Sequence, residues 1–251
     1  MKSTERFSDK VENYIKYRPG YPDELIDFLK RDIALTGTET IADIGSGTGK
    51  LSELLLKSGF DVIGVEPNEP MRLACEQLIG DDSNFQSIDG TAENTTLNEN
   101  SVDVVVAAQS FHWFDIKQCL PEFNRILKTK RYPVLLIWNE REMKREGIMK
   151  EYNQLLTDYS IDYNAVNHHD LDAHTFNAFF SDGYEVASFE YKQPLNLEGF
   201  TGRYLSCSYA LPQEDTRYVL AMDEIQRIFQ KHEDNGEIVL VYNTTVYYGD
   251  I

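Results

Sequence analysis

The chain has 251 residues, of which 41% are hydrophobic and 12% aromatic, which suffices for a full core and is too apolar for a disordered protein. Asp and Glu outnumber Lys and Arg by 42 to 24, giving a formal net charge of −18. Because nucleic acids and anionic membranes attract basic surfaces, this charge argues against both as partners. The sequence gives no indication of oligomeric state.

The cysteines Cys75, Cys119 and Cys207 are far apart and form no CxxC pair. They indicate neither a disulfide framework nor a zinc site, and we expect no metal. The first residues lack the apolar stretch of a signal peptide, and no apolar run approaches the roughly 18 residues needed to span a bilayer. We therefore expect a cytoplasmic protein.

Short apolar runs alternate with amphipathic stretches through the first 140 residues. Strands are predicted at Ile41–Ile44, Asp61–Glu66, Phe85–Ile88, Val102–Ala108 and Val134–Trp138. Helices are predicted between them at Leu51–Lys57, Met71–Ile79 and Ile116–Leu127. This alternation is typical of a parallel sheet with helices on both faces.

The pattern is less regular after residue 140. Helices are predicted at Glu151–Tyr159, Thr175–Phe180 and Asp215–Lys231, and strands at Tyr184–Tyr191 and Ile238–Tyr248. We interpret the chain as one domain with a helical insertion between its last two strands, near residues 195–235.

The first predicted strand runs into three glycines, in Ile41-Ala-Asp-Ile-Gly-Ser-Gly-Thr-Gly-Lys50. Glycines allow a tight turn close to a ligand, and the following helix offers free N–H groups. A dinucleotide-binding fold needs G-x-G-x-x-G, but Lys50 takes the sixth position of the frame that starts at Gly45. A P-loop needs a glycine six residues before a Lys–Ser/Thr pair, and Ile44 and Leu51 occupy those places. Both phosphate-binding interpretations fail.

Two acidic residues indicate the kind of ligand. Asp43 heads the loop as D-x-G-x-G-x-G, where a carboxylate suits an ammonium group and repels a pyrophosphate. Glu66 stands 17 residues past Gly49, at the end of the second predicted strand. A carboxylate there accepts hydrogen bonds from both ribose hydroxyls. The pattern predicts a ligand with adenosine, an amino-acid tail and no phosphate.

Four segments between residues 40 and 140, taken in order, resemble the Rossmann-like (class I) S-adenosylmethionine-dependent methyltransferases. They are Asp43-Ile-Gly-Ser-Gly-Thr-Gly49, Val62-Ile-Gly-Val-Glu-Pro67, Asp89-Gly-Thr-Ala-Glu93 and Ser101-Val-Asp-Val-Val-Val106. The stretches Arg6–Pro22 and Gln109–Asp115 are similar to a narrower branch, whose members mostly have small-molecule or unknown substrates. The resemblance therefore implies methyl transfer to a small-molecule acceptor, through oxygen, nitrogen or a carboxylate.

The resemblance also implies an α/β fold with a seven-stranded, mostly parallel sheet, helices on both faces and a helical insertion before the last strand. The whole of 1–251 would be a single methyltransferase domain. Its expected parts are an N-terminal helical lid at 1–38, a cofactor-binding core at 39–140 and substrate-side elements at 141–251, with the insertion at about 195–235.

S-adenosylmethionine is the cofactor that the resemblance implies, and it assigns the binding residues by position. Asp43 and the Gly45–Gly47 backbone would hold the methionine end, Glu66 the ribose, and Pro67 and Met71 the adenine. The full set of expected cofactor-binding residues is Tyr14, Arg18, Asp43, Gly45, Ser46, Gly47, Glu66, Pro67, Met71, Thr91, Ala92, Glu93 and Gln109.

Two parts of this assignment have alternatives. Relatives often carry Asp where Thr91 stands, so the backbone N–H of Ala92 is the other expected adenine contact. Tyr14, Tyr17 and Arg18 also fit the docking of an N-terminal helix.

The stretch Gln109-Ser-Phe-His-Trp-Phe-Asp115 follows the fourth predicted strand, where such sheets bind ligands. His112 is the candidate catalytic base for a hydroxyl or amine acceptor, with an orienting role or a place in the pocket wall as alternatives. A carboxylate acceptor needs no base, and Arg18 then becomes the residue of interest. The helix at Asp215–Lys231 and its flanks would cover the acceptor. The candidate substrate-binding residues are Trp113, Tyr204 and Tyr209.

Other functions are weighed against this one. The failed G-x-G-x-x-G argues against an NAD(P)-dependent oxidoreductase. No Asn/Asp-Pro-Pro-Tyr and no Pro-Cys follows the fourth strand, which argues against methylation of nucleic-acid bases. A non-catalytic S-adenosylmethionine-binding regulatory protein is compatible with every feature of the sequence.

Overall fold

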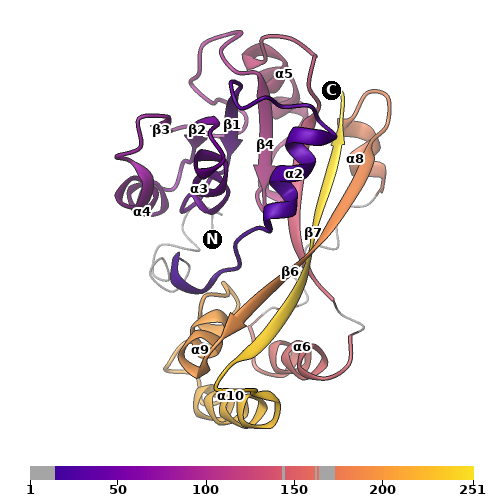
Figure 1. Ribbon diagram of the computed structural model, residues 1–251. Coiled ribbons are helices and arrows are strands. Elements are labelled where there is room, and N and C mark those ends of the chain that lie inside the picture. Colours follow the sequence, from indigo (N-terminus) through magenta and orange to yellow (C-terminus); the bar gives the residue numbers. More distant parts are fainter. Residues whose placement is uncertain (1–14, 143–144, 162, 164–172) are drawn as a thin grey trace.

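The computed structural model describes residues 15–142, 145–161, 163 and 173–251 (Figure 1). Its strands are β1 (Thr40–Ile44), β2 (Asp61–Val65), β3 (Phe85–Ile88), β4 (Val104–Ala108), β5 (Val134–Arg141), β6 (Glu185–Leu195) and β7 (Ile238–Gly249). Its helices are α2 (Asp23–Arg31), α3 (Lys50–Lys57), α4 (Glu69–Ile79), the short 3₁₀ helix η3 (Phe111–Trp113), α5 (Ile116–Ile126), α6 (Ile148–Asp158), α8 (Ala173–Phe179), α9 (Leu197–Leu205) and α10 (Tyr218–His232).

The strands form one seven-stranded sheet in the order β3-β2-β1-β4-β5-β7-β6. The pairs from β3 to β5 are parallel, and β7 runs antiparallel to both β5 and β6. The predicted α/β fold with a seven-stranded, mostly parallel sheet is confirmed.

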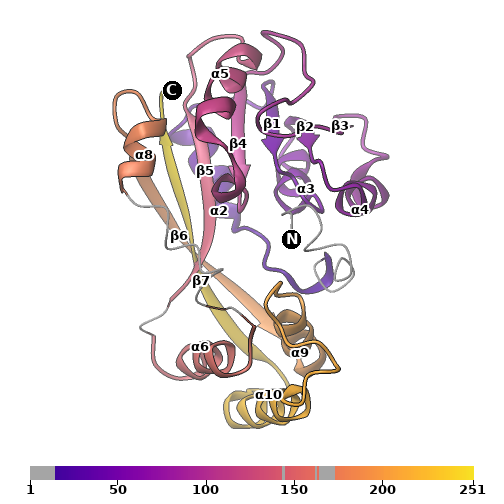
Figure 2. The ribbon, with the colours of Figure 1, turned by 180° about the vertical axis from the view of Figure 1, so that it is seen from behind.

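Helices cover both faces of the sheet because its central strands are apolar on both sides. In β4, Val104 and Val106 pack into a core with α2 and α3, whereas Val105 and Ala107 pack into a core with α5 and α8. Successive side chains of a strand point to opposite faces, so a continuous apolar run serves two layers. Figure 1 shows α2 and α3 in front of the sheet, and Figure 2 shows α5 on the opposite face.

Three strands run longer than the sequence pattern predicts. β5 was expected to end at Trp138 but continues to Arg141, because β7 pairs with it residue by residue as far as Arg141 and Tyr242. Polar side chains in this extension are satisfied across the sheet: the Thr244 hydroxyl donates to Asn139 Oδ1 at 2.6 Å. Antiparallel pairing thus supports polar residues that interrupt the apolar pattern.

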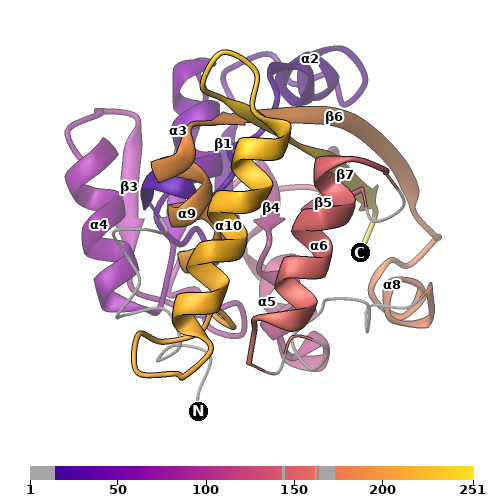
Figure 3. The same cartoon turned by 90° about the horizontal axis from the view of Figure 1, so that it is seen from below.

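The extended strands carry a second group of helices. α6, α9 and α10 pack around the far ends of β6 and β7 and form a core of their own, which includes Tyr152, Phe200 and Ile228. Seen from below, these helices lie across the end of the sheet (Figure 3). No helix among the described residues is long and apolar enough to cross a membrane.

The segment before α2 forms hydrogen bonds both to the sheet and to the segment that follows α9. The Arg18 guanidinium donates to the Ser206 carbonyl at 3.1 Å, and the Gln193 amide donates to the Tyr17 carbonyl at 2.9 Å. Asn139 donates to the Gly20 carbonyl at 2.7 Å. α2 itself packs on the sheet, so the residues that precede it are the ones that reach the space between the helices and the sheet.

Candidate functional site

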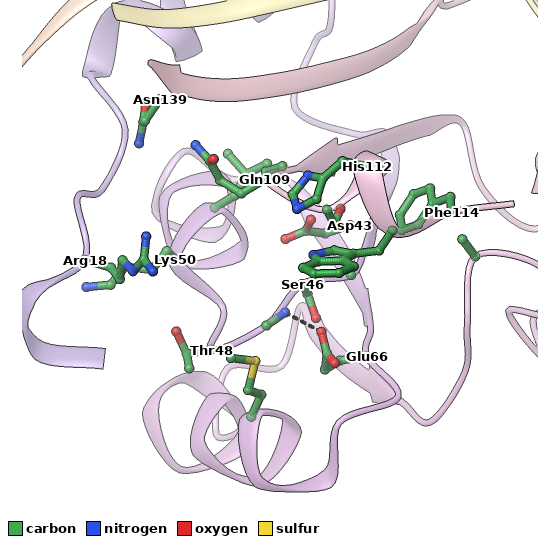
Figure 4. A pocket seen from close by; sticks show the side chains of 18 of the residues that line it. Arg18, Asp43, Ser46, Thr48, Lys50, Glu66, Gln109, His112, Phe114 and Asn139 are labelled. Atoms are coloured by element: carbon green, nitrogen blue, oxygen red, sulfur yellow. Dashed lines mark hydrogen bonds between the residues drawn. The ribbon is translucent and has the colours of Figure 1, made fainter. Parts of the chain in front are cut away.

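A pocket lies at the carboxyl ends of the parallel strands, between the sheet and the second group of helices (Figure 4). Most of the residues singled out in the sequence line it. They are Arg18, Asp43, Gly45, Ser46, Gly47, Glu66, Pro67, Met71, Thr91, Ala92, Glu93, Gln109, His112, Trp113 and Tyr209. Tyr14 lies outside the described residues.

The glycine loop brings backbone to the floor of the pocket directly after β1. Gly45 and Gly47 have φ angles of +70° and +58°, which side chains rarely allow. A Cβ added to Gly45 would lie 2.5 Å from the Cβ of Ser110. The Ser110 hydroxyl in turn donates to the Ile44 carbonyl at 2.7 Å, which joins the ends of β1 and β4. The loop therefore needs glycine where the two strand ends meet.

The Glu66 carboxylate lies at the end of β2 and is only 7% exposed. It accepts hydrogen bonds from the backbone N–H groups of Gly47 at 2.9 Å, drawn in Figure 4, and of Asn68 at 2.8 Å. Burial raises its pKa, while these two bonds lower it. Each carboxylate oxygen keeps a lone pair beyond its bond to the chain, so Glu66 is suited to accept from two neighbouring hydroxyls of a ligand.

The Asp43 carboxylate is 1% exposed. Its Oδ2 accepts a hydrogen bond from the Ser52 hydroxyl at 2.7 Å, whereas its buried Oδ1 has no partner among the described residues. Burial raises the pKa of Asp43 to about 7. The hydrogen bond from Ser52 opposes this shift, and the negative charge of Glu66 adds to it. A buried acceptor without a donor is unfavourable. Asp43 therefore fits a ligand that brings a positively charged N–H group.

The expected adenine-binding residues form the side of the pocket next to β2 and β3. Met71 and Ala92 are buried there. Thr91 is held in a turn, since its hydroxyl and carbonyl both accept from the Asn94 N–H. Glu93 accepts from the Asp115 N–H at 2.9 Å, which links this turn to the aromatic stretch.

The aromatic stretch forms η3, immediately after β4. Phe111 points into the core, 4.7 Å from the ring of Phe179. The rings of His112 and Trp113 lie 4.8 Å apart and line the pocket, with Trp113 41% exposed at its rim. His112, Asp43 and Gln109, labelled in Figure 4, all line this pocket. This stretch therefore separates into one core residue and two pocket residues.

The structure corrects the expectation for Tyr204. This side chain is 0% exposed and belongs to the core of α6, α9 and α10. Its hydroxyl donates to the Tyr159 carbonyl at 2.5 Å and accepts from the Leu211 N–H at 3.2 Å. Because α9 turns Tyr204 toward α10, it does not line the pocket.

The helix at Asp215–Lys231, which was expected to cover the acceptor, corresponds to α10. None of the described residues that line the pocket comes from α10; on this side the pocket is lined by Arg203 of α9 and by Ser208 and Tyr209 that follow it. α10 packs behind, against α6 and α9.

Several residues that line the pocket were not predicted from the sequence. They include Thr48, Lys50, Ser110, Asn139, Arg141, Arg203 and Ser208. The sequence could have indicated Arg203, because it is the one basic residue between Lys192 and Arg217. Arg141 lies in the part of β5 that the apolar pattern does not reveal.

A sheet with parallel central strands, a glycine loop after β1 and an acidic residue after β2 is typical of Rossmann-like nucleoside-binding folds. Comparison with known families refines this class, since residues 42–132 match the family model described as a methyltransferase domain. Residues 42–132 thus resemble the methyltransferase domain, a family whose members generally use S-adenosylmethionine.

The relatives agree with this family. An uncharacterized methyltransferase of Mycobacterium tuberculosis is 36% identical over 154 residues, which are 60% of this chain and 58% of that protein. The match thus spans less than two thirds of the mycobacterial relative. An uncharacterized methyltransferase-like protein of Schizosaccharomyces pombe is 27% identical over 96% of this chain and 93% of its own.

A solved structure shows the same fold. It is described as a type II methyltransferase from Anaeromyxobacter dehalogenans, with a TM-score of 0.66 and 18% identity. The match covers 93% of this chain and 98% of that one.

Proposed function

We propose that this chain binds S-adenosylmethionine in the pocket and transfers its methyl group to a small-molecule acceptor. The observation that carries the proposal is the buried Asp43 Oδ1, which has no donor among the described residues, next to the glycine loop. The ammonium of a methionine tail would supply that donor. Ribose hydroxyls would fit Glu66 on the other side of the loop, and a pyrophosphate would face two carboxylates.

The chain's own residues would bind and orient both reactants. When bound, the cofactor would supply a methyl group activated by a positively charged sulfur. An acceptor hydroxyl or amine must also lose a proton, and the His112 imidazole at the end of β4 would take it. A pocket that holds the two reactants in line replaces an encounter between free molecules.

We expect the purified protein to bind S-adenosylmethionine and S-adenosylhomocysteine, and NAD at least about 100-fold more weakly. The reason is the repulsion of a pyrophosphate by Asp43 and Glu66. Isothermal titration calorimetry of the three ligands checks this, and NAD binding as tight as that of S-adenosylhomocysteine would overturn the proposal. Incubation with S-adenosylmethionine and a metabolite extract separates an enzyme from a binding protein, because only turnover releases S-adenosylhomocysteine, detected by mass spectrometry.

We expect the affinity for S-adenosylhomocysteine to fall as the pH is lowered through 7. The pKa of Asp43 is raised to about 7, so below that pH the free protein carries a neutral acid that attracts an ammonium poorly. The decrease should approach about tenfold per pH unit. Calorimetry between pH 5.5 and 8.5 measures it.

Asp43→Asn is the control for this pH dependence, because it should weaken binding and flatten the profile. The free energy of unfolding of the ligand-free protein should instead decrease as the pH rises. A folded-state pKa raised above the unfolded value contributes stability at low pH that is lost as the pH rises through about 7. If the affinity of Asp43→Asn for S-adenosylhomocysteine depends on pH as strongly as that of the wild type, a group other than Asp43 causes the pH dependence.

A further inference from the structure

The wall of the pocket formed by the end of β5 and by α9 is positively charged. Arg18, Arg141 and Arg203 come from three separate parts of the chain, and all three line the pocket. This concentration is unexpected in a chain with 42 acidic and 24 basic residues. Arg141 and Arg203 are not among the expected cofactor-binding residues, most of which lie around the glycine loop and the ends of β2 and β3.

The oxygen partners of Arg141 and Arg203 are uncharged hydroxyl and amide groups. Arg141 donates to Tyr163 Oη at 2.8 Å, to Asn153 Oδ1 at 3.1 Å and to Tyr209 Oη at 3.3 Å. The guanidinium of Arg203, a residue that is 2% exposed, donates to Tyr242 Oη at 3.0 Å.

Arg203 Nη1 also lies 3.4 Å from Ser206 Oγ and 3.2 Å from Cys207 Sγ. Among the described residues, no carboxylate forms an ion pair with Arg141 or with Arg203. The hydroxyl and amide groups around them satisfy hydrogen bonds without cancelling the two charges.

The charge of these arginines also acts on the pKa of the neighbouring Cys207 thiol. Burial raises the pKa of the Cys207 thiol, but the guanidiniums of Arg203, Arg18 and Arg141, with a hydrogen bond from Tyr209, lower it to about 7. A positive field that favours a buried thiolate favours any anion in the same place. Burying cations without a full counter-charge is costly, so an anionic ligand would stabilise the charges of Arg141 and Arg203.

Carboxylate is the anion that fits best. The planar guanidinium fork matches a carboxylate through two parallel hydrogen bonds, and Arg141 has N–H groups beyond its three bonds to the chain. A phosphate dianion carries more charge and would be repelled more strongly by Asp43 and Glu66, which line the same pocket. The cofactor's own carboxylate has other cations within reach, since Arg18 and Lys50 also line the pocket and Lys50 directly follows the glycine loop.

We propose that the methyl acceptor is a small carboxylic acid whose carboxylate binds at Arg141 and Arg203, beside the hydroxyl of Tyr209. This inference rests on the proposed function and names the substrate class of the same pocket. The carboxylate is the anchor, and a second group of the same molecule, a hydroxyl or amine, receives the methyl group near His112.

The experiment first saturates the protein with S-adenosylhomocysteine and then titrates a panel of hydroxy and amino acids with three to eight carbons. Each acid is paired with its amide and with the phosphate monoester of matching length. We expect at least one acid to bind, its amide to bind at least about tenfold more weakly, and the phosphate ester to bind no more tightly than the acid.

Arg141→Gln tests the proposed anchor directly. We expect it to lower the affinity for the acid by about 10- to 100-fold and to leave the affinity for S-adenosylhomocysteine within about twofold. Arg145→Gln is the matched control: it removes the same charge from an exposed residue that pairs with Glu190 outside the pocket, and it should change neither affinity. Arg141→Lys keeps the charge without the fork, and it should bind the acid between the wild type and Arg141→Gln. Thermal melts establish that each variant is folded, and Arg141→Lys carries the test if Arg141→Gln is not.

Three results would overturn the proposal: no acid of the panel binds more tightly than its amide, a phosphate ester binds more tightly than every acid, or the Arg141 variants lose S-adenosylhomocysteine instead of the acid. The last result would assign Arg141 to the cofactor's carboxylate. A failure of the proposed function is distinguishable from all three, because the unmodified protein would then bind no S-adenosylhomocysteine in the first step.

Discussion

We expect His112→Ala to lower the turnover number by roughly 10²–10⁴-fold while the affinity for S-adenosylhomocysteine stays within about twofold. The substitution removes the imidazole that would take the acceptor's proton. The methionine end and the ribose of the cofactor would be held by Asp43 and Glu66, so cofactor binding should persist. Steady-state kinetics with the identified acceptor, calorimetry with S-adenosylhomocysteine and a thermal melt measure the three quantities.

His174→Ala is the matched control for this variant, since it removes an exposed imidazole from α8 outside the pocket. It should leave all three quantities unchanged. A raised KM with a surviving turnover number in His112→Ala would show that the imidazole only orients the acceptor. A lower melting temperature with unchanged kinetics would make it a wall residue.

Replacing Glu66 by Ala should weaken S-adenosylhomocysteine binding by about 2–3 kcal/mol, or roughly 30- to 150-fold. The ligand would lose charge-assisted hydrogen bonds to its ribose hydroxyls. The loop would also lose an acceptor, because Glu66 accepts from the N–H groups of Gly47 and Asn68. Calorimetry of the variant checks the affinity, and circular dichroism checks that the fold is kept.

Two variants separate the contributions to this loss. Glu69→Ala removes an exposed carboxylate at the start of α4, outside the pocket, and should bind as the wild type does. Glu66→Gln keeps an acceptor oxygen without the charge and should bind with intermediate affinity. An unchanged dissociation constant in Glu66→Ala would show that Glu66 is not the ribose ligand.

The first half of the fold was predictable because its signals are local. β1 ends in glycines whose positive φ angles and contact with Ser110 exclude larger residues. β4 is apolar on both faces because helices cover both. Such constraints act within a few neighbouring residues, so the sequence shows them directly, and Asp43 and Glu66 follow from their places at the ends of strands.

The charged wall of the pocket could not be predicted, because it depends on pairing between distant segments. Arg141 belongs to a strand only because β7 extends alongside it, about 100 residues later in the chain. Tyr204 and Tyr209 are equally aromatic in the sequence, and the end of α9 between them turns the first into the core and leaves the second beside Arg141. The proposed cofactor-binding side of the pocket was therefore determined by the sequence itself, through strand ends and glycines that a short segment specifies. The charged wall that we propose as the acceptor's anchor was decided by tertiary structure, since its charge arises where β5, α9 and the N-terminal segment meet.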